Sequence, residues 1–212
     1  MERKAIIFDL DGVIVHTDEL HYSGWKKLSD RLGIYFDKQI NNRCRGVSRM
    51  ESLDIILENS SVVYSAREKE SFAEEKNTYY RQLLENMTPA DVEPDARMTL
   101  DVLKAKGYKL AIGSSSKNAR LILAKVGLEN FFHAVSDGND ISHSKPDPEV
   151  FLKAAEFLCE LPENCIVVED AVAGIEAGKL CGMYTIAVGN AAIAQVADYN
   201  ISSLTQLITL LT

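Results

Sequence analysis

The chain has 212 residues, 46% of them hydrophobic, which is enough to bury the core of one or two domains. Its net charge of -8 argues against a surface that coats nucleic acid, so an anionic substrate would need a local basic cluster or a cation. No apolar run approaches the roughly 20 residues of a membrane span, and the four cysteines include no C-x-x-C pair. We therefore expect a cytoplasmic protein with reduced thiols, no signal peptide and no membrane contact.

The first predicted element is a short apolar strand, residues 5–8, that stops at two carboxylates, Asp9 and Asp11. Continuous apolar character is typical of a parallel strand buried on both faces, and ligands gather beyond the carboxyl ends of such strands. On an extended chain these two side chains point to the same side, about 6.6 Å apart. One could serve as nucleophile or metal ligand and the other as acid or base. The alternative is an ordinary Asp-Gly turn at the end of a strand.

Helical patterning then extends from about Asp18 to Asn86, with no proline before Pro89. A first helix is predicted by residues that recur at four-residue spacing: Leu20, Gly24, Leu28 and Leu32. It should end at Gly33, because glycine is a common C′ residue. Two further helix starts fit capping boxes, one at Ser48 to Glu51 and one at Ser65 to Glu68. Residues 88–94 contain two prolines and are predicted to be a linker. The junctions near Val15 and residues 86–91 are candidate hinges.

From Asp95 onward, predicted helices and strands alternate. The expected elements are a helix to 106, a strand at 108–112, a helix at 117–126, a strand at 133–136, a helix opened by Asp147 and Pro148, a strand at 165–168, a helix at 172–180, a strand at 184–188, and a last strand and helix within 197–204. This alternation predicts βαβ units, and strand 5–8 must join their sheet. We therefore predict an α/β fold: a doubly wound parallel sheet with a Rossmann-like core (residues 1–15 and 89–212) and an inserted all-helical cap domain (residues 16–88).

Three further polar clusters follow predicted strands: residues 114–118, Lys145 with Pro146, and Glu169 with Asp170. Phosphoryl transfer needs such a set, because it uses a carboxylate nucleophile, a divalent cation with oxygen ligands, a hydroxyl and an ammonium. Each cluster has a structural alternative, since Asp170 and the serines could cap helices and Lys145 could be a solvated surface lysine. Their occurrence at successive strand ends favours the catalytic interpretation.

On four motifs the chain resembles the haloacid dehalogenase superfamily over nearly its whole length: Phe8-Asp9-Leu10-Asp11-Gly12-Val13, Ser114, Lys145 and Glu169-Asp170. Within the superfamily it is most similar to the β-phosphoglucomutases, through further residues that include Arg45-Gly46-Val47-Ser48-Arg49, Lys76-Asn77 and Ser144-Lys145-Pro146. The resemblance implies a helical cap over a doubly wound core, one Mg²⁺, and interconversion of β-D-glucose 1-phosphate and D-glucose 6-phosphate through a bisphosphate.

The resemblance also implies roles for the residues of the core motifs. Asp9 would be the nucleophile that forms an aspartyl-phosphate, and Asp11 would be the general acid/base for the sugar oxygen. Ser114 and Lys145 would hold the transferring phosphoryl group. Mg²⁺ would be bound by the Asp9 carboxylate, the Asp11 backbone carbonyl, Glu169 and Asp170.

By the same resemblance, Arg49 would bind the non-transferring phosphate, helped from the core by Ser116, Lys117 and Asn118. Six further residues would line the sugar pocket or steady Asp11: Thr17, His21, Trp25, Gly46, Ser52 and Lys76. Trp25 could instead be a core aromatic residue, and His21 a structural histidine. The chain departs from the mutase pattern at His16, where a hinge aspartate is usual.

Two other functions stay open at this point. A Mg²⁺-dependent sugar-phosphate phosphatase would use the same core but let water attack the phosphorylated Asp9. A phospho-aspartate signalling receiver domain also has an aspartate, a hydroxyl, a lysine and Mg²⁺ on a parallel sheet, but gives no reason for a helical insertion of this size. We expect a small-molecule sugar phosphate as the partner, no nucleic acid, and a monomer.

Overall fold

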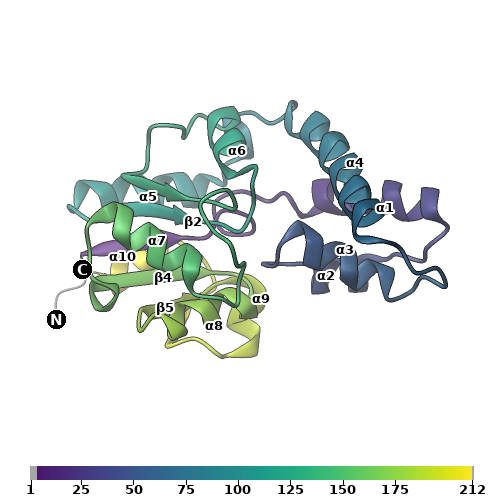
Figure 1. The fold of residues 1–212 in the computed structure, drawn as a ribbon. Coiled ribbons are helices and arrows are strands. Elements are labelled where there is room, and N and C mark those ends of the chain that lie inside the picture. The colour runs from purple at the N-terminus through teal and green to yellow at the C-terminus, as the bar shows by residue number, and fades with distance from the viewer. Residues whose placement is uncertain (1–3, 212) are drawn as a thin grey trace.

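The computed structural model describes residues 4–211, and within that range a six-stranded parallel sheet forms the centre of the core (Figure 1). Its strands are β1 (Ala5–Phe8), β2 (Lys109–Gly113), β3 (Ala134–Ser136), β4 (Cys165–Glu169), β5 (Tyr184–Ala187) and β6 (Tyr199–Asn200). Their spatial order is β3-β2-β1-β4-β5-β6, with Phe8 of β1 in register with Ile112 of β2 and Val168 of β4. The strand order reverses between β1 and β4, and ligands of doubly wound sheets bind at the carboxyl ends of the strands at such a point.

Helices cover both faces of the sheet. The face to which Ile6 and Phe8 point is covered by α5 (Pro94–Ala105), α6 (Ala119–Lys125) and α10 (Gln206–Leu210). The opposite face, to which Ala5 and Ile7 point, is covered by α7 (Glu149–Leu158) and α8 (Val172–Leu180). All four side chains of β1 are fully buried, as expected of a central parallel strand. The predicted doubly wound parallel sheet is confirmed.

The helical cap lies beside the sheet (Figure 1) and consists of α1 (Asp18–Leu32), α2 (Lys38–Arg43), α3 (Arg49–Leu57) and α4 (Ala66–Leu84). It has its own hydrophobic core, which includes Trp25, Leu53 and Ile56. Its two connections to the sheet run side by side, because Val15 and Val92 form an antiparallel bridge. This arrangement supports the division into residues 1–15 with 89–212 and residues 16–88, which we retain as a proposal.

Local sequence signals place several cap helices as expected. Gly33 ends α1 in the left-handed conformation, at a φ of 69° that favours glycine. Both capping boxes are present: Ser48 and Glu51 begin α3, and Ser65 and Glu68 begin α4. No helix within the described residues is long and apolar enough to cross a membrane.

Some predicted boundaries are wrong. The last helix, α10, begins at Gln206, beyond the predicted segment, and α6 begins at Ala119, because residues 117 and 118 belong to the preceding loop. The expected linker contains a single 3₁₀ turn, η1 (Pro89–Asp91), and α5 starts at Pro94. Pro148 is the N-cap of α7, and Asp147 contributes by accepting from the Glu149 backbone N–H at 2.9 Å. A second 3₁₀ turn, η2 (Pro162–Asn164), precedes β4, and the short α9 (Gly189–Ala194) follows β5; neither was predicted.

Candidate active site

Charged side chains converge at the carboxyl ends of β1 and β4. Asp9 follows β1, Glu169 ends β4, Asp170 comes next, and one oxygen of each carboxylate lies within 4.8 Å of the others. The loop after β3 brings in Lys145, whose Nζ donates to Asp9 Oδ1 at 2.6 Å and lies 3.6 Å from Glu169 Oε2. Lys145 is fully buried, so the surface-lysine interpretation is wrong. Burial opposes its charged form, but Asp9 and Glu169 outweigh burial and raise the pKa of Lys145.

The carboxylate cluster has the features of a cation site. Both carboxylate oxygens of Glu169 are buried, and neither forms a hydrogen bond with any residue from 4 to 211. Burial, followed by the charge of Asp9, raises the pKa of Glu169 well above its usual range and that of Asp170 to about 7. A Cβ on Gly174 would overlap the Glu169 carboxyl group, so this glycine leaves the room that the cluster needs. Buried, crowded oxygen donors of this kind fit a hard divalent cation.

Asp170 does not cap the helix that follows it, which excludes the simplest structural interpretation. The N-cap of α8 is Ala171, and no side chain caps that helix. The Asp170 carboxylate instead accepts a hydrogen bond from Arg45 Nη1 at 2.9 Å. Arg45 belongs to the cap, so the carboxylate cluster is in contact with both parts of the molecule.

Asp11 has different surroundings from Asp9. Its carboxylate accepts a hydrogen bond from the Thr17 hydroxyl, and the turn after it is made by Gly12 at a φ of 89°. The Asp-Gly turn is therefore present, and the Asp11 side chain faces the cavity described below. Burial, followed by the charge of Asp9, raises the pKa of Asp11 to about 7. A carboxyl group with such a pKa can both take up and release a proton at neutral pH.

The loop after β2 presents hydroxyl, amide and ammonium groups toward the same region. Ser114 Oγ accepts from the Ser116 backbone N–H at 3.2 Å, and Ser116 Oγ accepts from that of Asn118 at 3.2 Å. Asn118 Nδ2 donates to Asn77 Oδ1 on α4 at 2.9 Å, which ties this loop to the cap. The serines thus order the loop itself and do not cap α6, whose N-cap is Asn118 without a side-chain cap, while Ser114 and Ser116 line the cavity described below.

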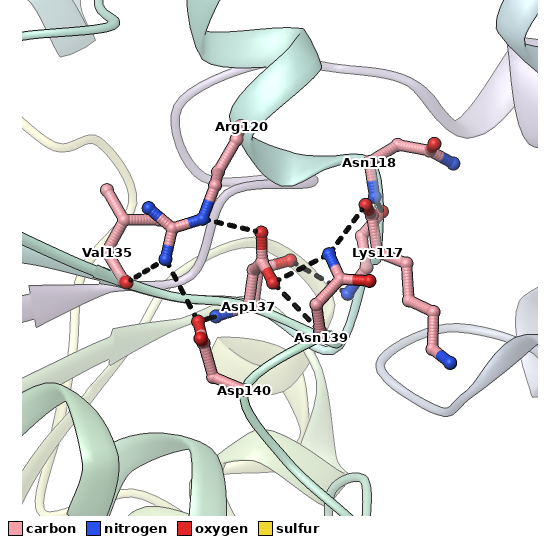
Figure 2. Close-up of polar contacts among 9 residues, drawn as sticks. Lys117, Asn118, Arg120, Val135, Asp137, Asn139 and Asp140 are labelled. Carbon is pink, nitrogen blue, oxygen red and sulfur yellow. Dashed lines mark hydrogen bonds and ion pairs between the residues drawn. The ribbon is translucent and has the colours of Figure 1, made fainter.

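The loop after β3 supports the loop after β2 through hydrogen bonds, as Figure 2 shows. Asn139 Nδ2 donates to the Lys117 carbonyl oxygen at 3.1 Å and to Asp137 Oδ1 at 3.0 Å. Asp137 is fully buried and lies 3.2 Å from Arg120 Nε, and Arg120 Nη2 also donates to Asp140 Oδ2 at 3.0 Å. The backbone at Lys117 is therefore fixed from the loop after β3. This support could not be predicted from the sequence, because residues 137–140 resemble any polar loop.

The cap side of the site is centred on Lys76 of α4. Its Nζ lies 3.0 Å from His21 Nδ1 and above the rings of Trp25 and Tyr80, 4.7 and 4.4 Å from their centroids. Burial, and next the charge of Arg49, lowers the pKa of Lys76 to about 7, and burial lowers the pKa of His21 well below its usual range. His21 is therefore neutral at pH 7. Trp25 belongs to the cap core and also lines the cavity, so both of its interpretations hold.

Other predicted cap residues hold the chain around this site. Arg49 begins α3, and its Nη1 lies 3.4 Å from Glu74 Oε2. Ser52 Oγ donates to the Ser48 carbonyl oxygen at 2.9 Å. Gly46 adopts a φ of 76°, and a Cβ there would lie 3.1 Å from the Cβ of Ala171 in the core. A larger residue would therefore disturb the place where cap and core approach each other.

A cavity of about 580 Å³ lies between cap and core, within the usual size range of small-molecule sites. Most of the predicted site residues line it: Asp9, Asp11, His21, Trp25, Gly46, Arg49, Ser52, Lys76, Ser114, Ser116, Lys117, Asn118 and Asp170. Thr17, Lys145 and Glu169 do not line it but contact residues that do, either Asp11 or Asp9. The structure therefore brings the predicted set together around one cavity.

Further residues line the cavity without having been assigned to it, among them Arg45, Asn77 and Tyr80. Tyr80 lies four positions after Lys76, so helical periodicity could have placed both on one face of α4. Arg45 and Asn77 stand in quoted motifs, but their contacts to Asp170 and Asn118 join residues far apart in sequence. No local pattern predicts such pairs.

Fold and site define the class of capped α/β enzymes whose reaction centre is a carboxylate cluster at the switch point of a parallel sheet. The model of the haloacid dehalogenase-like hydrolase family matches residues 3–182, and the chain belongs to this family.

Individual relatives include both mutases and phosphatases. The chain is 41% identical over 188 residues to a β-phosphoglucomutase of Bacillus subtilis, covering 88% of this chain and 83% of that protein. It is 31% identical to a phosphorylated carbohydrates phosphatase of Thermotoga maritima, covering 86% and 83%. The crystal structure of a β-phosphoglucomutase from Clostridium difficile superposes with a TM-score of 0.91 at 41% identity, covering 98% of this chain and 93% of that one.

Proposed function

We propose that this protein is a β-phosphoglucomutase, which interconverts β-D-glucose 1-phosphate and D-glucose 6-phosphate through an aspartyl-phosphate enzyme and glucose 1,6-bisphosphate. The similarity to mutases of two bacteria supports the proposal. The observation that carries it is the cavity, which has Asp9 and Ser114 on its core side and the cations Arg49 and Lys76 on its cap side. A bisphosphate has two anionic ends, and a cavity with a reactive group at one end and basic side chains at the other suits it.

Asp9 is the proposed nucleophile. Its carboxylate attacks the phosphorus of the bound phosphate ester, a bond forms between carboxylate oxygen and phosphorus, and the bond to the sugar oxygen breaks. Lys145 holds Asp9 through the 2.6 Å hydrogen bond and places a positive charge beside the transferring group, while the Ser114 hydroxyl on the cavity wall can donate to a phosphoryl oxygen. In the reverse half-reaction a sugar hydroxyl attacks the phosphorylated Asp9.

Asp11 is the proposed acid/base residue. When a sugar oxygen leaves phosphorus it gains negative charge, and the protonated Asp11 donates its proton to that oxygen. When a sugar hydroxyl attacks, the carboxylate of Asp11 accepts the proton. Both forms are available at neutral pH, because the pKa of Asp11 is about 7, and the Thr17 hydroxyl fixes the orientation of the carboxyl group.

The proposed metal is Mg²⁺, held by the carboxylates of Asp9, Glu169 and Asp170 and by the Asp11 backbone carbonyl. The Glu169 oxygens, which form no hydrogen bond with any residue from 4 to 211, and the mutual proximity of the three carboxylates support this assignment. When bound, Mg²⁺ supplies positive charge that offsets the repulsion between these carboxylates and a phosphate.

The cap residues are proposed to bind the sugar and the second phosphate. Arg49 and Lys76 line the cavity, where the Arg49 guanidinium can donate charge-assisted hydrogen bonds to a phosphate, and Lys117 and Asn118 face the same space from the core. His21 is held by Lys76 and presents a neutral ring suited to hydrogen bonding with sugar hydroxyls. We further propose that the enzyme works as a cytoplasmic monomer.

A sugar-phosphate phosphatase is the alternative favoured by a specific observation, the similarity to the Thermotoga maritima phosphatase. Phosphorus NMR with β-D-glucose 1-phosphate, Mg²⁺ and a trace of glucose 1,6-bisphosphate separates the two functions. We expect the substrate resonance to be replaced by that of glucose 6-phosphate while inorganic phosphate stays near its starting level. Release of one inorganic phosphate for each substrate consumed would establish the phosphatase instead.

A further inference from the structure

Arg45 places a positive charge from the cap on the carboxylate cluster of the core. It lies between α2 and α3, and its guanidinium bridges two carboxylates: Nη1 donates to Asp170 Oδ2 at 2.9 Å, and Nη2 donates to Asp18 on α1. The Arg45 side chain is 24% exposed and that of Asp170 only 8%. The contact is therefore largely shielded from water, where a charge-assisted hydrogen bond is strong.

This contact engages a carboxylate that a cation would also use. Asp170 belongs to the three-carboxylate cluster, so a divalent cation and the guanidinium compete for the same group and repel each other. Arg45 has an alternative position, because Asp18 can hold its guanidinium after Asp170 is lost. The Arg45 Nε is buried without a hydrogen-bond partner among the described residues, so the bridging arrangement leaves one donor unsatisfied.

We propose that Arg45 is a protein-supplied counter-ion of Asp170 that gives way to the divalent cation and then stays paired with Asp18. Metal binding then weakens a contact that holds cap and core together, so that cation entry loosens the closed cap. This inference rests on the proposed metal site. Arg45 is a positioning residue here, since it acts through Asp170.

The test measures binding of Mn²⁺ alone, without substrate, by the loss of the free-ion signal in electron paramagnetic resonance. Wild type, Arg45→Ala and the control Arg43→Ala are compared at pH 8 and one ionic strength. Arg43 lies two residues away and forms an exposed ion pair with Glu58, which also belongs to the cap. Its removal therefore changes the net charge equally but leaves the contact with Asp170 intact. We expect Arg45→Ala to bind Mn²⁺ about tenfold more tightly than wild type, since one charge-assisted contact no longer competes, and Arg43→Ala to match wild type.

The outcomes separate this inference from the metal site itself. Wild type that binds no Mn²⁺ would overturn the site, and the role of Arg45 with it. Mn²⁺ binding by wild type with equal or weaker binding by Arg45→Ala would overturn the role of Arg45 alone, as would an equal gain in Arg43→Ala. Thermal unfolding of each variant confirms that it is folded before binding is compared.

Hydrogen exchange followed by mass spectrometry gives a second readout, with and without Mg²⁺. Amides of residues 44–47 should exchange faster in wild type when Mg²⁺ is added, because the contact from Arg45 to Asp170 is lost. In Arg45→Ala the same amides should already exchange fast, and Mg²⁺ should change them little. Slower or unchanged exchange in wild type on adding Mg²⁺ would contradict the proposal.

Discussion

Asp9 and Asp11 are two residues apart, yet their surroundings differ in ways that suit different tasks. Asp9 is held by the buried Lys145 ammonium and shares its site with Glu169 and Asp170. Asp11 accepts a hydrogen bond from the Thr17 hydroxyl, and burial together with the charge of Asp9 raises its pKa to about 7. A carboxylate held in place by a buried ammonium is suited to act as a nucleophile, whereas a carboxyl group with a pKa near 7 is suited to exchange protons.

The Asp9→Asn variant should have no measurable mutase or phosphatase activity while remaining folded. An amide is nearly isosteric with the carboxylate, but it cannot form the acyl-phosphate intermediate. Activity is measured by phosphorus NMR and folding by thermal unfolding, with wild type as the reference. Turnover by pure Asp9→Asn would remove Asp9 from its proposed role.

The Asp11→Asn variant should keep the nucleophile but lose proton transfer to the sugar oxygen. General acid/base catalysis is worth about 10²–10⁴-fold, so kcat should fall by that factor. Steady-state kinetics with β-D-glucose 1-phosphate measure the loss. If Asp11→Asn kept wild-type turnover, Asp11 would contribute only its backbone to the site.

Lys76 should make the stability of the protein depend on pH. Its pKa in the folded protein is about 7, below the ordinary 10.5, because of burial and the charge of Arg49. Between pH 7 and 10.5 the unfolded chain therefore binds a proton at Lys76 that the folded chain does not. The loss of folding stability caused by Lys76 is therefore complete below pH 7 and becomes smaller as the pH rises toward 10.5.

The Lys76→Met variant should thus unfold at a higher urea concentration than wild type at pH 6.5, and the difference should narrow at pH 8 and again at pH 9.5. Lys38→Met serves as a control, since Lys38 is exposed and pairs with Glu19 on the cap surface, and it should change the stability little at any pH. A difference between wild type and Lys76→Met that is the same at all three pH values would show that Lys76 has an ordinary pKa.

Local chemistry decides which elements could be predicted from sequence. Gly33 and the capping boxes at Ser48 and Ser65 act within one turn of the chain, and the structure places helix ends there. The short α2 and α9 have only six residues each, too few for an apolar period to repeat, and both went unpredicted. The residues of the core site were found because each follows a strand, and parallel strands end at one edge of the sheet.

Contacts that join cap and core could not be predicted in the same way. Arg45 meets Asp170, and Asn77 meets Asn118, only after the bundle has packed against the sheet. The hydrogen bonds and ion pair of Asp137 could not be predicted either, because they depend on how the loops after β2 and β3 pack against each other. Such pairs follow from tertiary packing and have no periodic signal.

At the element level, the capping box of α4 should contribute measurably to stability. Ser65 Oγ accepts from the Glu68 backbone N–H, and Glu68 Oε2 accepts from that of Ser65 at 2.8 Å. Ser65→Ala should lower the free energy of unfolding by about 1 kcal/mol. Ser71→Ala, at an exposed position inside the same helix, should change it by less than about 0.5 kcal/mol. Urea unfolding compares the two, and equal effects would show that the cap is not the cause.

At the scale of the whole molecule, cap and core close around the cavity through polar contacts outside the carboxylate cluster: Glu51 with Ser144, and Asn77 with Asn118. A mutase needs this closure, because its phospho-enzyme must meet a sugar hydroxyl and not water. It also needs a distal site for the second phosphate in both half-reactions. A phosphatase acting on a monophosphate has no second phosphate to hold.

Arg49 should therefore distinguish the two activities. Charge-assisted hydrogen bonds from its guanidinium to a phosphate are each worth about 1.5–3 kcal/mol, or roughly 10–150-fold in rate. Arg49→Ala should cut mutase turnover at least about tenfold while sparing, or raising, the slow release of inorganic phosphate from acetyl phosphate. Both rates are measured at one Mg²⁺ concentration, with Arg43→Ala as the charge-matched control. Equal losses in the two rates would show that Arg49 supports the fold or the core site.

The fate of the phosphoryl group on Asp9 tests the central claim most directly. Enzyme phosphorylated with labelled acetyl phosphate is mixed with β-D-glucose 1-phosphate and Mg²⁺, and the label is followed into glucose bisphosphate and inorganic phosphate during one turnover. A mutase with a closed cap should pass most of the label to the sugar, and adding the sugar should speed the loss of label from the enzyme. Label that appears mainly as inorganic phosphate, at a rate independent of the sugar, would contradict the mutase assignment.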